Sequence, residues 1–270
     1  MQRRHRAVHL LGRGVVAAVS NALMATGAYP LLVHAARRSL RGALGEWACA
    51  LAASAARPAG FLPLPGAHVH GERPLVMLHG YAMNRANFTL LASRLARGGV
   101  GPIVGFEYWS LGRVSTAARQ LAAFVDDVRA RTGAAQVDLI GHSMGGVVAR
   151  YYVSFGGGDG PVAHLVTLGS PHGGTDMSAL GVGFPSRELV IGAPLVTRLA
   201  ATPTPTTTKL LTIWSRSDAL VPASRQQPIP GAVTRVYDDL GHLALLASRR
   251  VAHEILHFVK YSLKSYPECL

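Results

Sequence analysis

Two kinds of hydrophobic pattern alternate along this chain from residue 74 onward. Short, almost continuous apolar runs predict strands, and between them apolar residues recur at helical spacing, as in 84–98 and 115–132. Strands that are apolar on both faces and alternate with helices are typical of a parallel sheet covered by helices. The pattern therefore predicts an α/β fold with helices on both faces of about six mainly parallel strands. The predicted strands are residues 74–78, 102–108, 136–140, 164–168, 209–214 and 233–238.

The first sixty residues follow a different pattern. Residues 14–36 contain no Asp, Glu, Lys or Arg and are long enough to span a bilayer, although Asn21 and Pro30 interrupt an apolar helix. Residues 42–56 form a shorter apolar run that includes Glu46, which favours an interfacial or packed helix. Three arrangements stay open for this region: a membrane-associated helical hairpin, a cleaved signal region and a soluble helical cap.

Composition narrows the partners that we expect. The formal net charge is +13, but the 27 basic residues are spread along the chain and no nucleic-acid-binding module is visible. Charged residues make up only 15% of the chain and hydrophobic residues 49%, which favours contact with lipid. We therefore expect anionic lipid headgroups, and no nucleic acid, as the partner of the basic surface. The two cysteines lack metal-ligand spacing.

The segment 141–145 has the form G-x-S-x-G, with Ser143 at its centre. It directly follows the predicted strand 136–140 and precedes a helical pattern that begins near Gly146. A strand, a tight turn and a helix in this order project the serine as a nucleophile. The surrounding glycines fit this prediction, because a side chain there would clash where strand and helix meet.

A serine nucleophile needs a base that accepts its proton and a carboxylate that orients the base. Asp218 follows the fifth predicted strand and His242 follows the sixth, so both belong to the edge of the sheet where ligands bind. We predict that His242 is the base and Asp218 the orienting acid. Asp238 and Asp239 are competing acids, but they lie too close to His242 in sequence to reach its far nitrogen easily.

The negative charge that develops on the substrate carbonyl requires two backbone N–H donors, which form an oxyanion hole. One donor is expected from Met144, the residue after the nucleophile. The other is expected from Tyr81, in the loop His79-Gly80-Tyr81 that follows the first strand.

A second motif, His253-Glu254-Ile255-Leu256-His257, matches the H-E-x-x-H pattern of zinc enzymes. A long helix is predicted to begin after His242 and to carry this motif. Val251, Ile255 and Phe258 form its apolar stripe, and the two histidines point away from that stripe. No third ligand follows at a suitable spacing, so we predict no metal site.

The chain resembles the bacterial lipases and esterases of the α/β-hydrolase superfamily, and it looks closest to the small lipases of the Bacillus lipase A group. The resemblance spans roughly residues 70–260. The segments that carry it are 78–81, 105–109, 137–146, 166–175, 217–218 and 241–243.

This resemblance implies the α/β-hydrolase fold and carboxylic ester hydrolysis, with Ser143, Asp218 and His242 as the triad and without a cofactor. It also implies that the neighbours of these residues contact the substrate. The expected substrate contacts are His79, Gly80, His142, Leu220 and Leu243.

We accordingly expect two parts: residues 1–60, an apolar helical region that anchors or rests on a membrane, and residues 61–270, the catalytic domain. Residues 173–206 hold no clear strand and are expected to line the acyl pocket or act as a lid. We predict a membrane-associated or cell-envelope protein, with secretion as the alternative. The same triad would also serve an acyltransferase, a thioesterase or an amidase, and a scaffold without activity is a further alternative.

Overall fold

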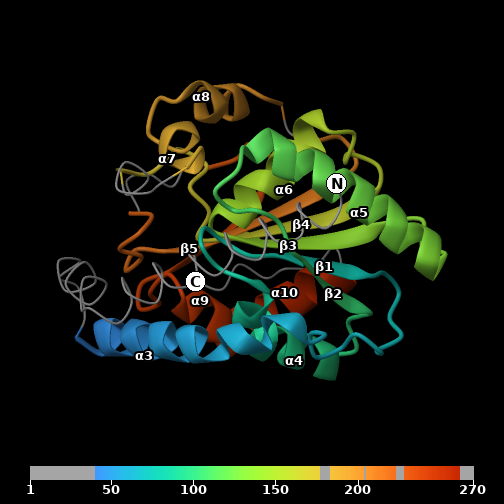
Figure 1. The fold of residues 1–270 in the computed structure, drawn as a ribbon, viewed down its shortest axis with the longest axis horizontal. Coiled ribbons are helices and arrows are strands. Elements are labelled where there is room, and N and C mark those ends of the chain that lie inside the picture. Colours follow the sequence, from blue (N-terminus) through green and yellow to red (C-terminus); the bar gives the residue numbers. More distant parts are fainter. Residues whose placement is uncertain (1–39, 177–182, 204, 223–227, 262–270) are drawn as a thin grey trace, which may run out of the picture.

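The fold is built around one six-stranded parallel sheet with the order β2-β1-β3-β4-β5-β6. A computed structural model describes residues 40–176, 183–203, 205–222 and 228–261 (Figure 1). All six predicted strands are present in it, and the predicted fold class is confirmed. The strands are β1 (Leu75–Leu78), β2 (Ile103–Phe106), β3 (Val137–His142), β4 (Val162–Leu168), β5 (Lys209–Ser215) and β6 (Val233–Tyr237).

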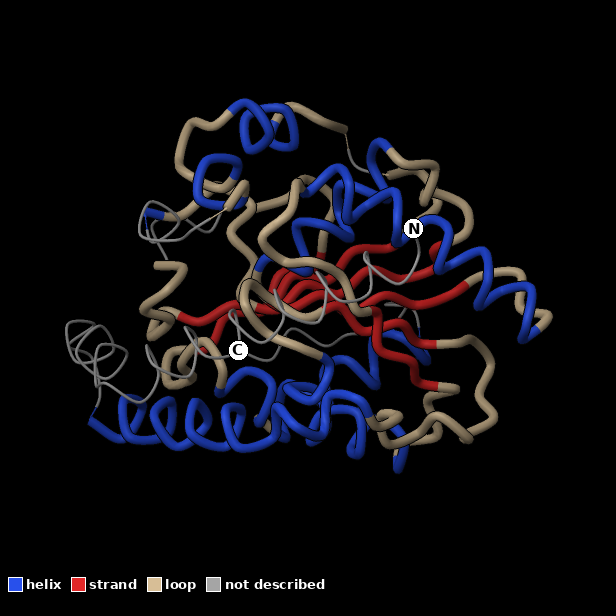
Figure 2. The backbone as a smooth tube through the Cα atoms, in the orientation of Figure 1, coloured by secondary structure: helices blue, strands red, loops and turns tan. Residues whose placement is uncertain are grey.

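The central strands are fully buried because helices cover both faces of the sheet (Figure 2). One face carries α5 (Val114–Thr132) and α6 (Met144–Phe155). The opposite face carries α4 (Thr89–Arg97), α9 (Ala244–Ala247) and α10 (Arg249–Tyr261). Each face therefore has its own apolar core, which explains why these strands are continuous apolar runs and do not alternate with polar residues.

Two of the predicted helices are interrupted. The pattern over 84–98 forms a 3₁₀ turn, η2 (Arg85–Phe88), followed directly by α4. The helix expected after His242 is split into α9 and α10 at Ser248, whose backbone is extended with ψ of 130°. The Ser248 hydroxyl accepts a hydrogen bond of 3.3 Å from the N–H of Val251, so the same residue ends one helix and caps the next.

The N-terminal region contributes α3 (Leu40–Ala56) and the 3₁₀ turn η1 (Arg57–Phe61). In Figure 1, α3 lies along the same face of the sheet as α4 and α9. None of the helices in the described part of the chain combines the length and the apolar character that spanning a bilayer requires. The apolar stretch 14–36 lies outside the described residues.

The segment 173–206 contains two short helices, α7 (Pro185–Glu188) and α8 (Pro194–Ala200), in its described part. Polar contacts fasten it to the core. The buried Arg150 of α6 donates a hydrogen bond of 2.8 Å to the carbonyl of Leu199, and burial lowers the pKa of its guanidinium to about 10. The Glu188 carboxylate accepts one of 2.8 Å from the N–H of Val114 at the start of α5.

Candidate active site

Ser143 occupies the sharp turn between β3 and α6. Its φ of 55° and ψ of −126° lie outside the regions that a residue with a side chain ordinarily adopts. Its N–H donates a hydrogen bond of 2.8 Å to the carbonyl of Leu168 at the end of β4. The strain is held by the neighbouring strand and by the helix that starts at Met144, as is common at functional sites.

The glycines that follow the serine are required by close packing. A Cβ on Gly145 would collide with the backbone carbonyl oxygens of Leu78 and His79 at the end of β1. A Cβ on Gly146 would collide with the side chain of Ser170. Helix α6 therefore reaches the sheet only because these two positions lack side chains.

His242 and Asp218 form a buried pair at the carboxyl ends of β5 and β6. The His242 Nδ1 lies 2.7 Å from the Asp218 Oδ2, and the two residues are 2% and 3% exposed. The other Asp218 oxygen accepts hydrogen bonds of 2.9 Å and 2.8 Å from the N–H groups of Leu220 and Val221. The carboxylate is thus fixed by its own turn and presents one oxygen to the imidazole.

The electrostatic surroundings of His242 favour its protonated form. Burial by itself lowers the pKa of this imidazole, but the charge and hydrogen bond of Asp218, and then the charge of Glu46, raise it above its usual value. An imidazole held in this way is a base whose cationic form is stabilised at the moment when it takes a proton.

The two competing acids lie on the surface. Asp238 pairs with Arg216 at 2.6 Å and Asp239 pairs with Arg250 at 2.5 Å, and all four side chains are exposed. Of these three aspartates, Asp218 is the one whose carboxylate contacts the His242 ring.

His142 connects the nucleophile turn with the histidine loop. Its Nε2 donates a hydrogen bond of 3.1 Å to the backbone carbonyl of His242, and the centroids of the two rings are 4.6 Å apart. Burial, followed by the charge of His242, holds the pKa of His142 well below its usual value, so this ring stays neutral. Since His142 precedes Ser143 directly, this contact fixes the distance between the two loops.

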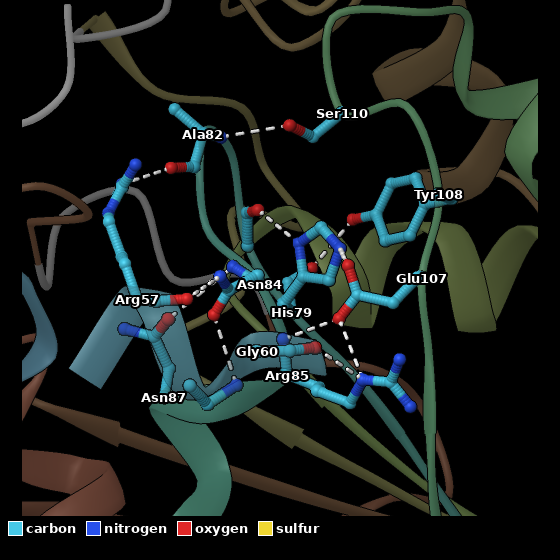
Figure 3. A network of polar contacts seen from close by, with 12 residues as sticks. Arg57, Gly60, His79, Ala82, Asn84, Arg85, Asn87, Glu107, Tyr108 and Ser110 are labelled. Carbon is cyan, nitrogen blue, oxygen red and sulfur yellow. Dashed lines mark hydrogen bonds and ion pairs between the residues drawn. The ribbon is translucent and has the colours of Figure 1, made fainter. Parts of the chain in front are cut away.

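The loop after β1, which contains Tyr81, is held by polar contacts from the β2 side (Figure 3). The Tyr108 hydroxyl donates a hydrogen bond of 2.6 Å to the carbonyl of His79, and the two rings are stacked 4.5 Å apart. Ala82, with a φ of 54°, donates its N–H to the Ser110 hydroxyl at 3.0 Å. These contacts fix the backbone from which the second oxyanion donor is expected.

The turn η1, which precedes β1 in the chain, also forms hydrogen bonds with the loop after β1, as Figure 3 shows. Arg57 donates a hydrogen bond to the carbonyl of Ala82, and the Asn84 amide donates one of 3.0 Å to the carbonyl of Arg57. Arg85 donates one of 2.8 Å to the carbonyl of Gly60. No pattern in residues 57–60 predicts these contacts, because their partners lie about 25 positions further along the chain.

Helix α3 packs on the loops that carry the site. Its residues Cys49 and Ala50 form a small apolar cluster with Leu220, Leu243 and Met83. Leu220 follows the proposed acid, Leu243 follows the proposed base, and Met83 belongs to the loop after β1. Two of the expected substrate contacts, Leu220 and Leu243, therefore lie against the N-terminal helix. The other three, His79, Gly80 and His142, are buried.

The second sequence motif lies apart from these residues. His253 is exposed, whereas His257 is half-buried and its ring centroid lies 5.2 Å from that of Tyr261. His257 therefore packs more closely than its place opposite the apolar stripe of α10 suggests. Among the residues that the structure describes, no cluster of three or more His, Cys, Asp or Glu side chains is arranged to hold a metal ion.

Residues 73–188 match a family model described as the α/β hydrolase fold. Over 59 residues the chain is 44% identical to a triacylglycerol lipase of Pseudarthrobacter phenanthrenivorans and, over a segment of the same length, 44% identical to one of Burkholderia plantarii. These matches cover 22% of this chain, 18% of the first relative and 16% of the second.

Among solved structures, the chain is similar to the mature form of the Bacillus licheniformis lipase BlEst2. The TM-score is 0.61 at 16% identity, over 69% of this chain and 94% of the other. The chain therefore has the α/β-hydrolase fold, and the expected resemblance to bacterial lipases and esterases is confirmed.

Proposed function

We propose that this protein, an α/β-hydrolase-fold chain similar to bacterial lipases, hydrolyses carboxylic esters of lipids through Ser143, His242 and Asp218. The observation that carries the proposal is the buried hydrogen bond between His242 and Asp218 at the carboxyl edge of the sheet, beside the strained turn of Ser143. A serine on such a turn, with a histidine that a carboxylate orients, is the arrangement that acyl transfer requires.

The hydrogen bond to Asp218 decides which nitrogen of His242 is the base. Nδ1 carries the proton that it donates to the carboxylate, so Nε2 is the nitrogen that accepts the proton of Ser143. The Ser143 oxygen then forms a bond to the ester carbonyl carbon, and His242 gives its proton to the leaving alcohol. In the second half-reaction His242 takes a proton from water while the water oxygen bonds to the acyl carbon. The bond between that carbon and the Ser143 oxygen then breaks, the fatty acid leaves, and His242 returns the proton to Ser143.

The backbone N–H groups of Met144 and Tyr81 are proposed to bind the oxyanion. Met144 is the first residue of α6, and N–H groups in the first turn of a helix have no partner within that helix. The positive end of the helix dipole adds to the attraction for negative charge. The contacts of Tyr108, Ser110 and Arg57 support this role by fixing the backbone on both sides of Tyr81.

The named activities of the relatives suggest acylglycerol esters as substrates, since both are called triacylglycerol lipases. Leu220, which is half-buried near the proposed acid, offers apolar surface for an acyl chain, whereas Leu243 is 2% exposed and packs against α3. The lid role of residues 173–206 stays a prediction. Its described helices are fastened to α5 and α6 by Arg150 and Glu188, and opening would break those bonds.

Membrane contact through residues 1–60 also stays a prediction. On α3, Trp47 and Leu51 lie one helical turn apart and are 43% and 42% exposed, an arrangement suited to insertion among lipid headgroups. Flotation of the full chain with anionic and neutral vesicles tests this contact, because binding to neither vesicle would contradict it.

The proposed function is tested with p-nitrophenyl esters of short and long acyl chains. We expect turnover by the wild type and a loss of about 10⁶-fold in kcat for Ser143→Ala, the order seen when a catalytic serine is removed. Ser154→Ala, in the last turn of the same helix α6, is the matched control and retains activity.

Labelling with a serine-directed phosphonate complements the ester assay. A wild-type protein that neither turns over any ester nor reacts with the phosphonate would contradict the proposal and favour a scaffold. Labelling without ester hydrolysis would instead point to transfer, thioester or amide chemistry, which product analysis with added alcohol separates.

A further inference from the structure

We propose that Glu46, a buried carboxylate of the N-terminal helix α3, is a positioning residue for His242. It fixes the backbone that carries the imidazole and places a negative charge beside it. This inference rests on the proposed function of His242 as the base, and it adds a part of the chain that neither the family match at residues 73–188 nor the predicted triad includes.

The Glu46 carboxylate accepts hydrogen bonds from consecutive backbone N–H groups just after His242. Its Oε1 lies 2.8 Å, and its Oε2 2.9 Å, from the N–H of Leu243, and its Oε2 also accepts a hydrogen bond of 2.9 Å from the N–H of Ala244. A Cβ on Gly241 would collide with the same carboxylate. The group is therefore in contact with the backbone on both sides of His242, across almost 200 positions of sequence.

The hydrogen bonds of Glu46 matter for stability because the carboxylate is buried and cannot be hydrated by water instead. Glu46 is 2% exposed, and Leu243 and His242 are each 2% exposed. A buried carboxylate is retained only where hydrogen bonds and opposite charge compensate its lost hydration. The backbone N–H groups of the histidine loop supply the hydrogen bonds, and an imidazolium at His242 supplies the opposite charge.

Among the residues that the structure describes, three titratable groups face His242 from the elements packed against it. Asp218 binds its Nδ1 from the loop after β5, His142 contacts it from the end of β3, and Glu46 approaches from α3. His142 stays neutral because burial and the charge of His242 lower its pKa. The two carboxylates are the groups whose charge stabilises the cation, Asp218 by direct contact and Glu46 from the other side of the loop.

The test compares two substitutions of Glu46 with one matched control. Glu46→Gln keeps the shape and one acceptor oxygen but removes the charge, whereas Glu46→Ala removes the acceptors as well. Asp159→Asn is the control. Its carboxylate also accepts hydrogen bonds from three consecutive backbone N–H groups, those of 206–208 at 2.8–3.0 Å, but it lies at the opposite end of the sheet, just before β4.

For Glu46→Gln we expect a shift in the titration of His242. Loss of one nearby negative charge moves the pKa of the imidazole downward, because the charge of Glu46 is one of the contributions that raise it. The shift is measured by NMR of labelled histidine, with the signal assigned through His242→Asn, and by the acid limb of kcat/KM. The NMR titration needs no turnover, so it tests this inference even if the proposed ester hydrolysis fails.

For Glu46→Ala we expect kcat to fall by roughly 10- to 100-fold with little change in KM, because a displaced base lowers the rate of the chemical step more than binding. Asp159→Asn lowers thermal stability and leaves both the His242 titration and kcat unchanged. The inference is overturned if Glu46→Gln leaves the pKa of His242 unchanged. It is also overturned if Glu46→Ala loses no more activity than Asp159→Asn. Should Glu46→Ala not fold, the glutamine variant alone decides.

Discussion

The nucleophile turn and the histidine loop meet at the same edge of the sheet, but they are built in different ways. The turn at Ser143 is made from one stretch of strand, glycines and helix, and its strained backbone follows from residues next to it in sequence. The loop at His242 is held by Asp218, 24 positions away, and by Glu46, 196 positions away.

The two proposed catalytic side chains are therefore positioned in different ways, one by local backbone structure and one by contacts with distant residues. A local turn is positioned as soon as its strand joins the sheet and its helix packs on it. A loop between a strand and a four-residue helix has little structure of its own, so it depends on partners from distant parts of the chain. His142 connects the nucleophile turn with the histidine loop, because its ring packs on the ring of His242 and donates a hydrogen bond to the His242 carbonyl.

Within this comparison of the two loops, the largest effect is expected for Asp218, one of the two distant carboxylates that hold the histidine loop. Asp218→Asn should lower kcat by about 10⁴-fold, because an amide no longer stabilises the imidazolium and can fix the wrong tautomer. Steady-state kinetics on the preferred ester measures this. The controls are Asp238→Asn and Asp239→Asn, exposed residues whose ion pairs with arginine contribute little. If either control lost as much activity as Asp218→Asn, the role of the orienting acid would have to be assigned to a different residue.

A smaller effect, on stability, is expected at the nucleophile turn. Gly145→Ala places a Cβ against two backbone carbonyl oxygens of the β1 end, which cannot rotate away as a side chain could. We expect a loss of about 1–3 kcal/mol in the free energy of unfolding, measured by urea denaturation.

Gly45→Ala is the control for that substitution, with the opposite sign. Gly45 lies in α3 with open space around its Cα, so alanine should stabilise the helix by about 0.5–1 kcal/mol. Equal effects at the two glycines would mean that close packing does not define the nucleophile turn.

The smallest effect concerns the pH dependence of the wild type. His242 acts as a base only when neutral, and its carboxylate partners raise its pKa, so the protonated form persists to higher pH than in a free histidine. The acid limb of kcat/KM should therefore have its midpoint above about 6.5, the ordinary value for histidine. Kinetics between acidic and mildly alkaline pH measure it, and a midpoint at or below that value would contradict the geometry of the histidine loop.

The strands were predictable because their unbroken apolar runs indicate burial on both faces of the sheet. The glycines after Ser143 likewise indicated the close approach of α6 to the sheet. The sequence favoured Asp218 over Asp238 and Asp239 through their spacing from His242. It did not show that Asp218 is buried and the other two exposed, because burial is a property of the folded chain. It gave no role to Tyr108 or Arg57, whose polar atoms contact the loop after β1 only once β2 and η1 lie beside it.

Glu46 did leave one signal in the sequence. It is the only acidic residue before Glu72, in a stretch otherwise rich in alanine and arginine. An isolated acid in an apolar helix indicates a specific partner, but nothing in the residues around it identifies that partner.

The succession of strands and helices along the chain and the form of the nucleophile turn follow from the sequence alone, because hydrophobic period and glycine spacing act over a few residues. The contact of a buried carboxylate with the His242 ring, and the packing of α3 on the loops of the site, are known only from the folded chain. Both depend on contacts between segments far apart in the chain, where burial in a low-dielectric interior makes a few hydrogen bonds and charges decisive.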